Sequence, residues 1–172
     1  MKKALILLAL LVGIAIVGVA YIKWDDIRSS TAYLVALLPP RMSRPVLIRF
    51  LDSSDELVVA DAAYQLGRVG GDEVYGPLTK AIGHPIPMVR HNAINAMIFL
   101  NQSDRAISET IKCTDNVNEE VFVIDSAIGL LGRQTRPDNK VMALDALQRL
   151  RKRNQYPNLN TEIDTAIRTL AQ

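Results

Sequence analysis

The feature that most constrains the fold is an apolar pattern that occurs three times in the middle of the chain. A valine is followed by apolar residues four and seven positions later, a spacing that places all three side chains on one face of a helix. The offsets between the three valines are 30 and 34 residues, which indicates a repeated unit. The residues are Val59, Ala63 and Leu66, then Val89, Ala93 and Ala96, and last Val123, Ala127 and Leu130.

A shorter helix is predicted before each long one, near residues 45–51, 74–82 and 105–111. Beyond Arg136 and Pro137, the segments LDALQRLRKR and NTEIDTAIRTLA flank a turn at Tyr156-Pro157-Asn158 and predict a fourth, divergent pair. Neither helix of such a pair can bury its apolar stripe alone, so neighbouring pairs must stack. The fold class predicted is therefore all-α, with stacked antiparallel helix pairs.

The repeated segments resemble HEAT repeats, including the bacterial HEAT-like repeats also found in phycobilisome lyases. Val89-Arg90 with Ala93 matches the family pattern best, and Leu66-Gly67 and Leu131-Gly132 match its helix end. The sequence departs from the pattern where Ala60 and Ile124 replace the arginine, and where the second copy ends in Phe99-Leu100 without a glycine. The resemblance covers residues 44–172 and implies a short α-solenoid that binds a protein or peptide, without implying a reaction.

Residues 4–22 form 19 consecutive uncharged positions, preceded by Lys2-Lys3 and followed by Lys23. As a helix they would rise roughly 28 Å, close to the thickness of a bilayer core. We therefore expect residues 1–24 to be a single membrane anchor with a cytoplasmic N-terminus and an extracytoplasmic, periplasmic repeat domain. The alternatives are a cleaved signal peptide, with Gly18-Val19-Ala20 as the cleavage site and a secreted product, or a repeat domain in the cytoplasm.

Residues 25–43 predict a capping helix followed by a proline-rich connector, because Pro39 and Pro40 cannot continue a helix. Ser29 or Ser30 is the expected N-cap. The apolar side expected to cover the open end of the stack consists of Tyr33, Leu34, Leu37 and Leu38.

The candidate binding site comes from aligning the three long helices by their valines. The resemblance implies that the second helix of each pair lines the concave face, where the polar residues Asp61, Gln65, His91, Asn95 and Asp125 would form a ridge. Successive helices lie about 8 to 10 Å apart, too far for these side chains to share one metal ion but suitable for an extended partner. The alternative is an ordinary solvated helix surface. For Arg90, the resemblance implies a structural role, in which it ties adjacent repeats through an acidic residue.

Charge and motif content narrow the function classes. The formal charge of +2 comes from Lys2 and Lys3, so the repeat region is neutral overall and binding to nucleic acid is not expected. Residues 51–73 are mainly acidic and residues 133–153 mainly basic, which suits either docking of an acidic protein or a solvated terminal helix. A single cysteine, Cys113, and no catalytic motif predict no enzyme, no cofactor, no metal and no small-molecule substrate.

The function predicted from these features is a non-catalytic, membrane-tethered scaffold or adaptor that binds a protein or peptide along its concave face. A bilin or tetrapyrrole lyase is one alternative, suggested by the resemblance alone. A structural repeat protein that is secreted after signal cleavage is the other.

Overall fold

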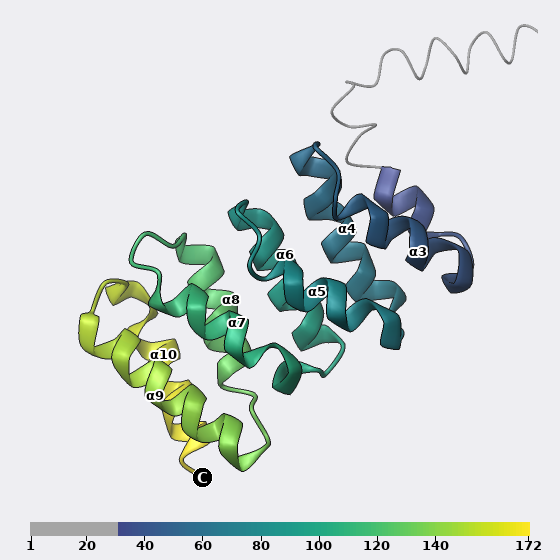
Figure 1. Cartoon of the computed structure of the whole chain (residues 1–172). Helices are drawn as coiled ribbons and strands as arrows, with labels where there is room; N and C mark the ends of the chain where they lie inside the picture. The colour runs from purple at the N-terminus through teal and green to yellow at the C-terminus, as the bar shows by residue number, and fades with distance from the viewer. Residues whose placement is uncertain (1–30) are drawn as a thin grey trace, which may run out of the picture.

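The computed structural model describes residues 31–172, which contain α-helices and 3₁₀ turns and no strand (Figure 1). Residues 31–36 form a short helix. The elements that follow are α3 (Pro40–Phe50), α4 (Glu56–Val69), η1 (Asp72–Val74), α5 (Tyr75–Ala81), α6 (Pro87–Phe99), α7 (Ser103–Asp115), α8 (Val121–Leu131), α9 (Pro137–Arg153), η2 (Pro157–Leu159) and α10 (Asn160–Leu170).

The helices pack as four consecutive pairs, α3 with α4, α5 with α6, α7 with α8, and α9 with α10. The second helices form one layer, in which α6 packs against α4 and α8, and α8 packs against α10. In the other layer α7 packs against α5 and α9, whereas α3 meets the η1 turn that precedes α5. The pairs follow one another in a single row (Figure 1), an arrangement consistent with a short α-solenoid.

The repeated apolar stripe forms the core, as the sequence predicts. Its three valines are at most 1% exposed, and the six other residues of the pattern are at most 4% exposed. One buried cluster joins the first three pairs, and a second cluster joins α7 and α8 to the fourth pair. Burial of these stripes is the main force that holds the pairs together.

Two glycines near helix ends allow neighbouring second helices to approach closely. A Cβ atom added at Gly67 would lie 2.8 Å from the Ala96 Cβ atom, so α4 and α6 meet here with no room for a side chain. A Cβ atom added at Gly132 would lie 3.0 Å from the Ala166 Cβ atom of α10. The Leu-Gly pairs that the sequence contains at these places therefore have a packing reason.

Polar bonds supplement the apolar contacts between pairs. The Asn92 side chain on α6 donates to the Ala60 carbonyl oxygen of α4 at 2.7 Å. On the other layer Asp104 of α7 accepts from the Thr135 hydroxyl at 2.8 Å and from the Asn139 amide at 3.1 Å. Each of these hydrogen bonds joins consecutive helix pairs. They fix the register of one pair on the next, while apolar burial holds the pairs together.

The helix at residues 31–36 packs through a different face from the one predicted. Ala32 is fully buried, and Val35 and Ala36 pack against the core. The four residues expected to cover the stack end, Tyr33, Leu34, Leu37 and Leu38, are instead 43–64% exposed. Small residues therefore make the contact, because they let this helix lie close to α4.

The predicted membrane segment, residues 1–24, lies outside the described residues, as do the predicted N-caps Ser29 and Ser30. Within residues 31–172 every helix is too short or too polar to span a bilayer.

Candidate functional site

The predicted polar ridge lies on three helices of the second-helix layer. Asp61 and Gln65 are on α4, His91 and Asn95 are on α6, and Asp125 is on α8. Hydrogen bonds connect the two residues on α4 with each other and the two on α6 with each other, and His91 also reaches α8 at Ser126.

The α4 part of the ridge is largely covered. The Gln65 amide donates to Asp61 Oδ1 at 3.1 Å, and its oxygen accepts from Arg68 at 3.4 Å. Gln65 was predicted to be a surface contact residue, but it is only 3% exposed. Its bonds to Asp61 and Arg68 hold the side chain against the fold. The Arg68 guanidinium lies 5.9 Å from the centre of the Tyr33 ring. Burial raises the pKa of the Asp61 carboxyl, and hydrogen bonds from Gln65 and the Tyr33 backbone, with the charge of Arg68, offset this only in part.

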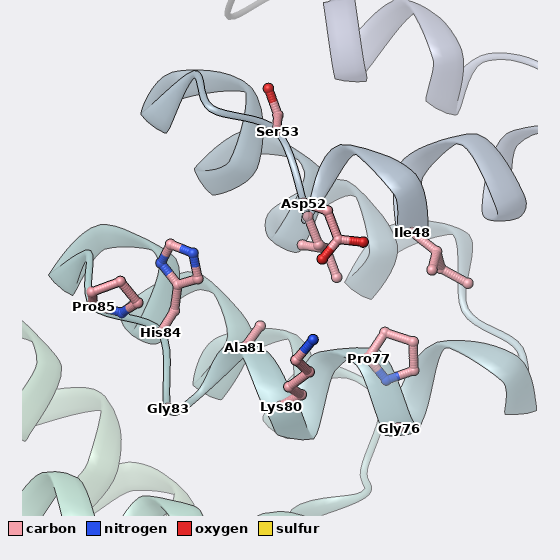
Figure 2. Close-up of a pocket in the computed structure, with 11 residues that line it drawn as sticks. Ile48, Asp52, Ser53, Gly76, Pro77, Lys80, Ala81, Gly83, His84 and Pro85 are labelled. Carbon is pink, nitrogen blue, oxygen red and sulfur yellow. The ribbon is translucent and has the colours of Figure 1, made fainter.

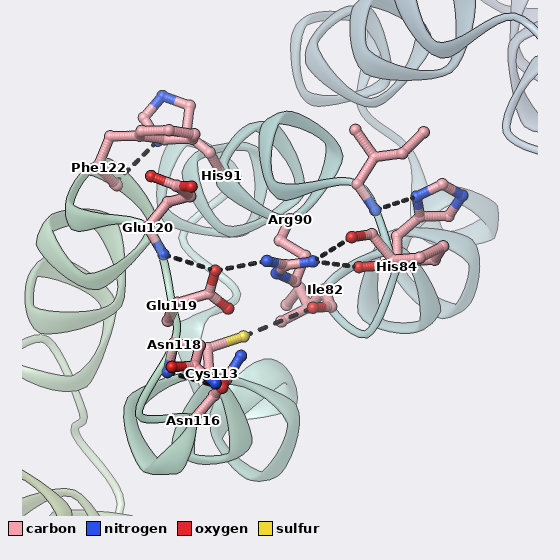
Figure 3. Close-up of polar contacts among 12 residues, drawn as sticks. Ile82, His84, Arg90, His91, Cys113, Asn116, Asn118, Glu119, Glu120 and Phe122 are labelled. Carbon is pink, nitrogen blue, oxygen red and sulfur yellow. Dashed lines mark hydrogen bonds and ion pairs between the residues drawn. The ribbon is translucent and has the colours of Figure 1, made fainter.

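The α6 part forms a small polar network with α8. His91 Nδ1 lies 2.8 Å from the Ser126 hydroxyl oxygen and 3.1 Å from the Phe122 carbonyl oxygen. The Asn95 amide nitrogen lies 3.1 Å from His91 Nε2. The His91 and Phe122 rings meet edge to face with centres 5.4 Å apart (Figure 3). His91 is thus held in place and contributes to the contact between the second and third pairs.

Asp125 is exposed and borders a hollow of about 480 Å³ between α8 and α10. Arg133 at the end of α8 and Thr161, Thr165 and Thr169 of α10 also line it. This hollow is open and its lining is mainly apolar, while the polar side chains at its border can form hydrogen bonds with a partner.

A second hollow lies between α4 and α6, and two exposed aromatic residues border it. The sequence did not predict either of them as a contact residue. Tyr64 is 51% exposed and Phe99 is 74% exposed. Together with Arg68 and Asn95 they line a hollow of about 200 Å³, whose floor is the Gly67–Ala96 contact. Both lie outside the repeated stripe, so helical periodicity gives no sign of them, and only their size and exposure mark them as contact residues.

Arg90 lies at the junction of the second and third pairs. Its guanidinium forms an ion pair with Glu119, in the turn between α7 and α8, and donates to the carbonyl oxygens of His84 at 2.6 Å and Pro85 at 2.8 Å (Figure 3). The Arg90 side chain is 12% exposed and that of Glu119 only 1%. The Glu119 carbonyl oxygen also accepts from the Tyr156 hydroxyl at 2.8 Å, which links the turn to the fourth pair.

A larger hollow of about 630 Å³ lies between α3 and α5, in the first-helix layer. Figure 2 shows Ile48 and Asp52 on one side and Pro77, Lys80 and His84 on the other. His84 Nδ1 accepts from the Ile86 backbone N–H at 3.2 Å, so in the neutral ring Nε2 carries the proton. Burial and the Arg90 charge lower the pKa of His84, against the opposite effect of Glu56. No sequence pattern indicated this hollow, because it depends on the spacing of two helices that do not follow each other directly.

Three arginines of the basic C-terminal end form ion pairs or hydrogen bonds with other helices of the chain. Arg149 forms ion pairs with Asp145 and, at 3.3 Å, with Asp115. Arg151 pairs with Asp164 of α10 at 2.9 Å, and Arg153 donates to the carbonyl oxygens of Thr114 and Asp115. These three arginines join α9 to α7 and α10, so their charges have partners within the chain.

The described residues contain no group of three or more His, Cys, Asp or Glu side chains placed to hold a metal ion. Cys113 is buried, and its Sγ atom lies 3.6 Å from the Ile82 carbonyl oxygen. Burial and the nearby Glu119 raise the pKa of the Cys113 thiol to about 11, so at neutral pH it is protonated. A protonated, buried thiol is a poor nucleophile and a poor metal ligand.

Over residues 31–172, fold and site together describe an all-helical stack of pairs with hollows on both layers. A scan against protein-family models matches none of them, and a search of the curated proteins finds no match.

Proposed function

We propose that this chain is a non-catalytic, HEAT-like scaffold, tethered to a membrane by residues 4–22, that holds a segment of another protein along its second-helix layer. The observation that carries the proposal is the exposed pair Tyr64 and Phe99 on either side of a hollow. Large aromatic side chains that remain exposed beside a hollow are the kind of group that dominates protein interfaces.

The chemistry around the hollow indicates what such a segment must offer. An apolar side chain fits between the two aromatic residues, and the Arg68 and Asn95 side chains can donate to carbonyl or carboxylate oxygens. Asp125 and the threonine-lined hollow lie further along the same layer. A partner segment that spans α4 to α10 would therefore place apolar groups in both hollows and hydrogen-bonding groups at their polar borders.

The resemblance to HEAT repeats supports this use of the second helices, and the paired packing of four consecutive units is what such a fold requires. The tether is proposed from the sequence, where residues 4–22 carry no charge. We also propose that the protein is not an enzyme. The buried, protonated Cys113, which is a poor nucleophile, supports this part of the proposal.

The test is site-specific photo-crosslinking in cells that produce the full chain. A benzophenone amino acid replaces Phe99, and in a matched control it replaces Val141 of α9, which is 69% exposed in the other layer. The proposal expects one protein to be captured from Phe99 and not from Val141. Replacing Tyr64 by alanine should reduce that capture about tenfold, the loss expected for one interface anchor. Equal capture from both positions, or none from Phe99, would contradict it.

A further inference from the structure

An exposed apolar surface lies at the N-terminal end of the stack, on the opposite end from α10. Its members are large side chains from the first helical segment, the proline joint and the start of α3, each 43–64% exposed. We call it the N-terminal apolar patch, and it consists of Tyr33, Leu34, Leu37, Leu38 and Met42.

The patch is held in a fixed position. Ala32 is fully buried, and Val35 and Ala36 pack on the core, so the opposite side of the segment must face outward. Pro39 and Pro40 join the segment to α3, and their rings fix the backbone at the turn. The apolar side chains are therefore presented by a rigid support and do not belong to a loose tail.

The two elements that carry the patch contain only positive charges, whereas Asp61 of the neighbouring α4 is bonded to the Tyr33 backbone. Residues 31–51 contain three arginines and no acidic residue. Arg41 and Arg49 are exposed, and Arg44 forms an ion pair with Glu73 at 2.8 Å. Apolar side chains bordered by arginines are the combination that favours the interface of a bilayer with anionic lipids.

Chain length places this surface close to the membrane. Eight residues, 23–30, separate the uncharged stretch from the described part of the chain. Even a fully extended segment of this length spans at most about 29 Å. Wherever residues 4–22 enter a bilayer, the beginning of the described part must lie within roughly that distance of its surface, and the patch starts two residues further on, at Tyr33.

We infer that the N-terminal apolar patch is inserted in the headgroup layer of the membrane that holds residues 4–22, so that the repeat stack is docked on the lipid surface by its first segment. This inference rests on the tether of the proposed function. The occupant is a phospholipid surface that contains anionic lipid, and the exposed arginines contact its headgroups. A second copy of the chain or another protein on the patch would be a different outcome.

The test uses the full chain in vesicles of phosphatidylcholine with phosphatidylglycerol. An environment-sensitive fluorophore is attached at Leu37→Cys, and the matched control carries it at Val141→Cys at the far end of the stack. The unsubstituted chain, whose only cysteine is the buried Cys113, is the labelling control. Interfacial segments enter roughly 5–10 Å into a bilayer, so lipids spin-labelled near the headgroup should quench about half of the Leu37→Cys emission and leave Val141→Cys unchanged.

Two results would overturn the inference. If the Leu37→Cys label remains as exposed to water and as unquenched as the Val141→Cys label, the patch is not in lipid. If it is shielded from water but not quenched by spin-labelled lipid, a protein or a second copy covers it. Flotation with vesicles after alkaline extraction tests the tether by itself, and crosslinking from Phe99 tests the hollow between α4 and α6 by itself. A failure of the inference can therefore be told from a failure of the proposed function.

Discussion

Arg90 and Glu119 form an ion pair that joins two helix pairs at a point almost closed to solvent, 29 residues apart in the sequence. A buried charge that loses its partner is strongly destabilising, whereas replacement of both charges by apolar groups can be neutral. We expect Arg90→Ala or Glu119→Ala to lower the free energy of unfolding by about 3–5 kcal/mol. Arg90→Met with Glu119→Leu should recover most of that loss. Urea denaturation in mild detergent, followed by circular dichroism, measures both. A loss below about 1 kcal/mol in either single variant would show that the pair is not structurally important.

A second prediction concerns the contact between α4 and α6. Gly67→Ala would place a methyl group 2.8 Å from the Ala96 Cβ atom and 2.9 Å from its Cα atom, and a backbone atom cannot move aside cheaply. We expect a loss of about 1–3 kcal/mol in the same denaturation measurement. Gly76→Ala is the matched control, because nothing lies within 4 Å of a Cβ atom there. It should stabilise the chain by about 0.5 kcal/mol by restricting the unfolded backbone. Equal effects of the two substitutions would contradict the close approach.

The third prediction is that Cys113 is unreactive in the folded chain. Its pKa is raised from 9.0 to about 11, so the thiolate fraction at pH 8 is lowered by about a hundredfold. Reaction with a thiol reagent should be slow in buffer and fast in urea. The unfolded thiol loses its proton at lower pH than the folded one, so stability should fall as the pH rises from 9.0 to about 11. Cys113→Ala removes that part of the pH dependence and is the control.

The fourth prediction concerns Asp104, which links α7 to the start of α9. Burial raises the pKa of its carboxyl, but hydrogen bonds from Asn139 and Thr135 outweigh burial and hold it below 3.8. A carboxylate whose folded pKa is lowered contributes stability above its unfolded pKa and loses that contribution as the pH falls through the folded value. Asp104→Ala should therefore cost about 1 kcal/mol at pH 7 and less at a pH below 3.8. An equal cost at both pH values would show that the charge is not involved.

Helix pairing could be predicted because it depends on local periodicity. Val59, Val89 and Val123 mark stripes that must be buried whatever lies elsewhere, and the structure buries them. The exact start of a helix is harder to predict from periodicity. The α8 helix begins at Val121 after Glu120, without a side-chain cap, although two asparagines precede it in the turn. There the Asn116 side chain accepts from the Asn118 backbone N–H at 3.1 Å.

The site was harder to predict, because its properties depend on contacts between distant residues. Gln65 occupies a polar position in the repeat, yet its bonds to Asp61 and Arg68 bury it. For Arg90, the resemblance implied an acidic partner in an adjacent repeat, but the spacing of residues did not identify that partner as Glu119. In residues 33–38 the large apolar side chains predicted the packed side, but the fully buried contact is made by Ala32.

The hollow between α3 and α5 follows from the unequal packing of the two layers. The first helix pair is attached to the second mainly where α4 meets α6, along a seam that Gly67 and Ala96 hold at minimal separation. In the first-helix layer α3 packs on α4 and meets the η1 turn, and the gap beside Pro77 and Lys80 stays open. A larger side chain that points into this gap would therefore cost less stability than one at Gly67.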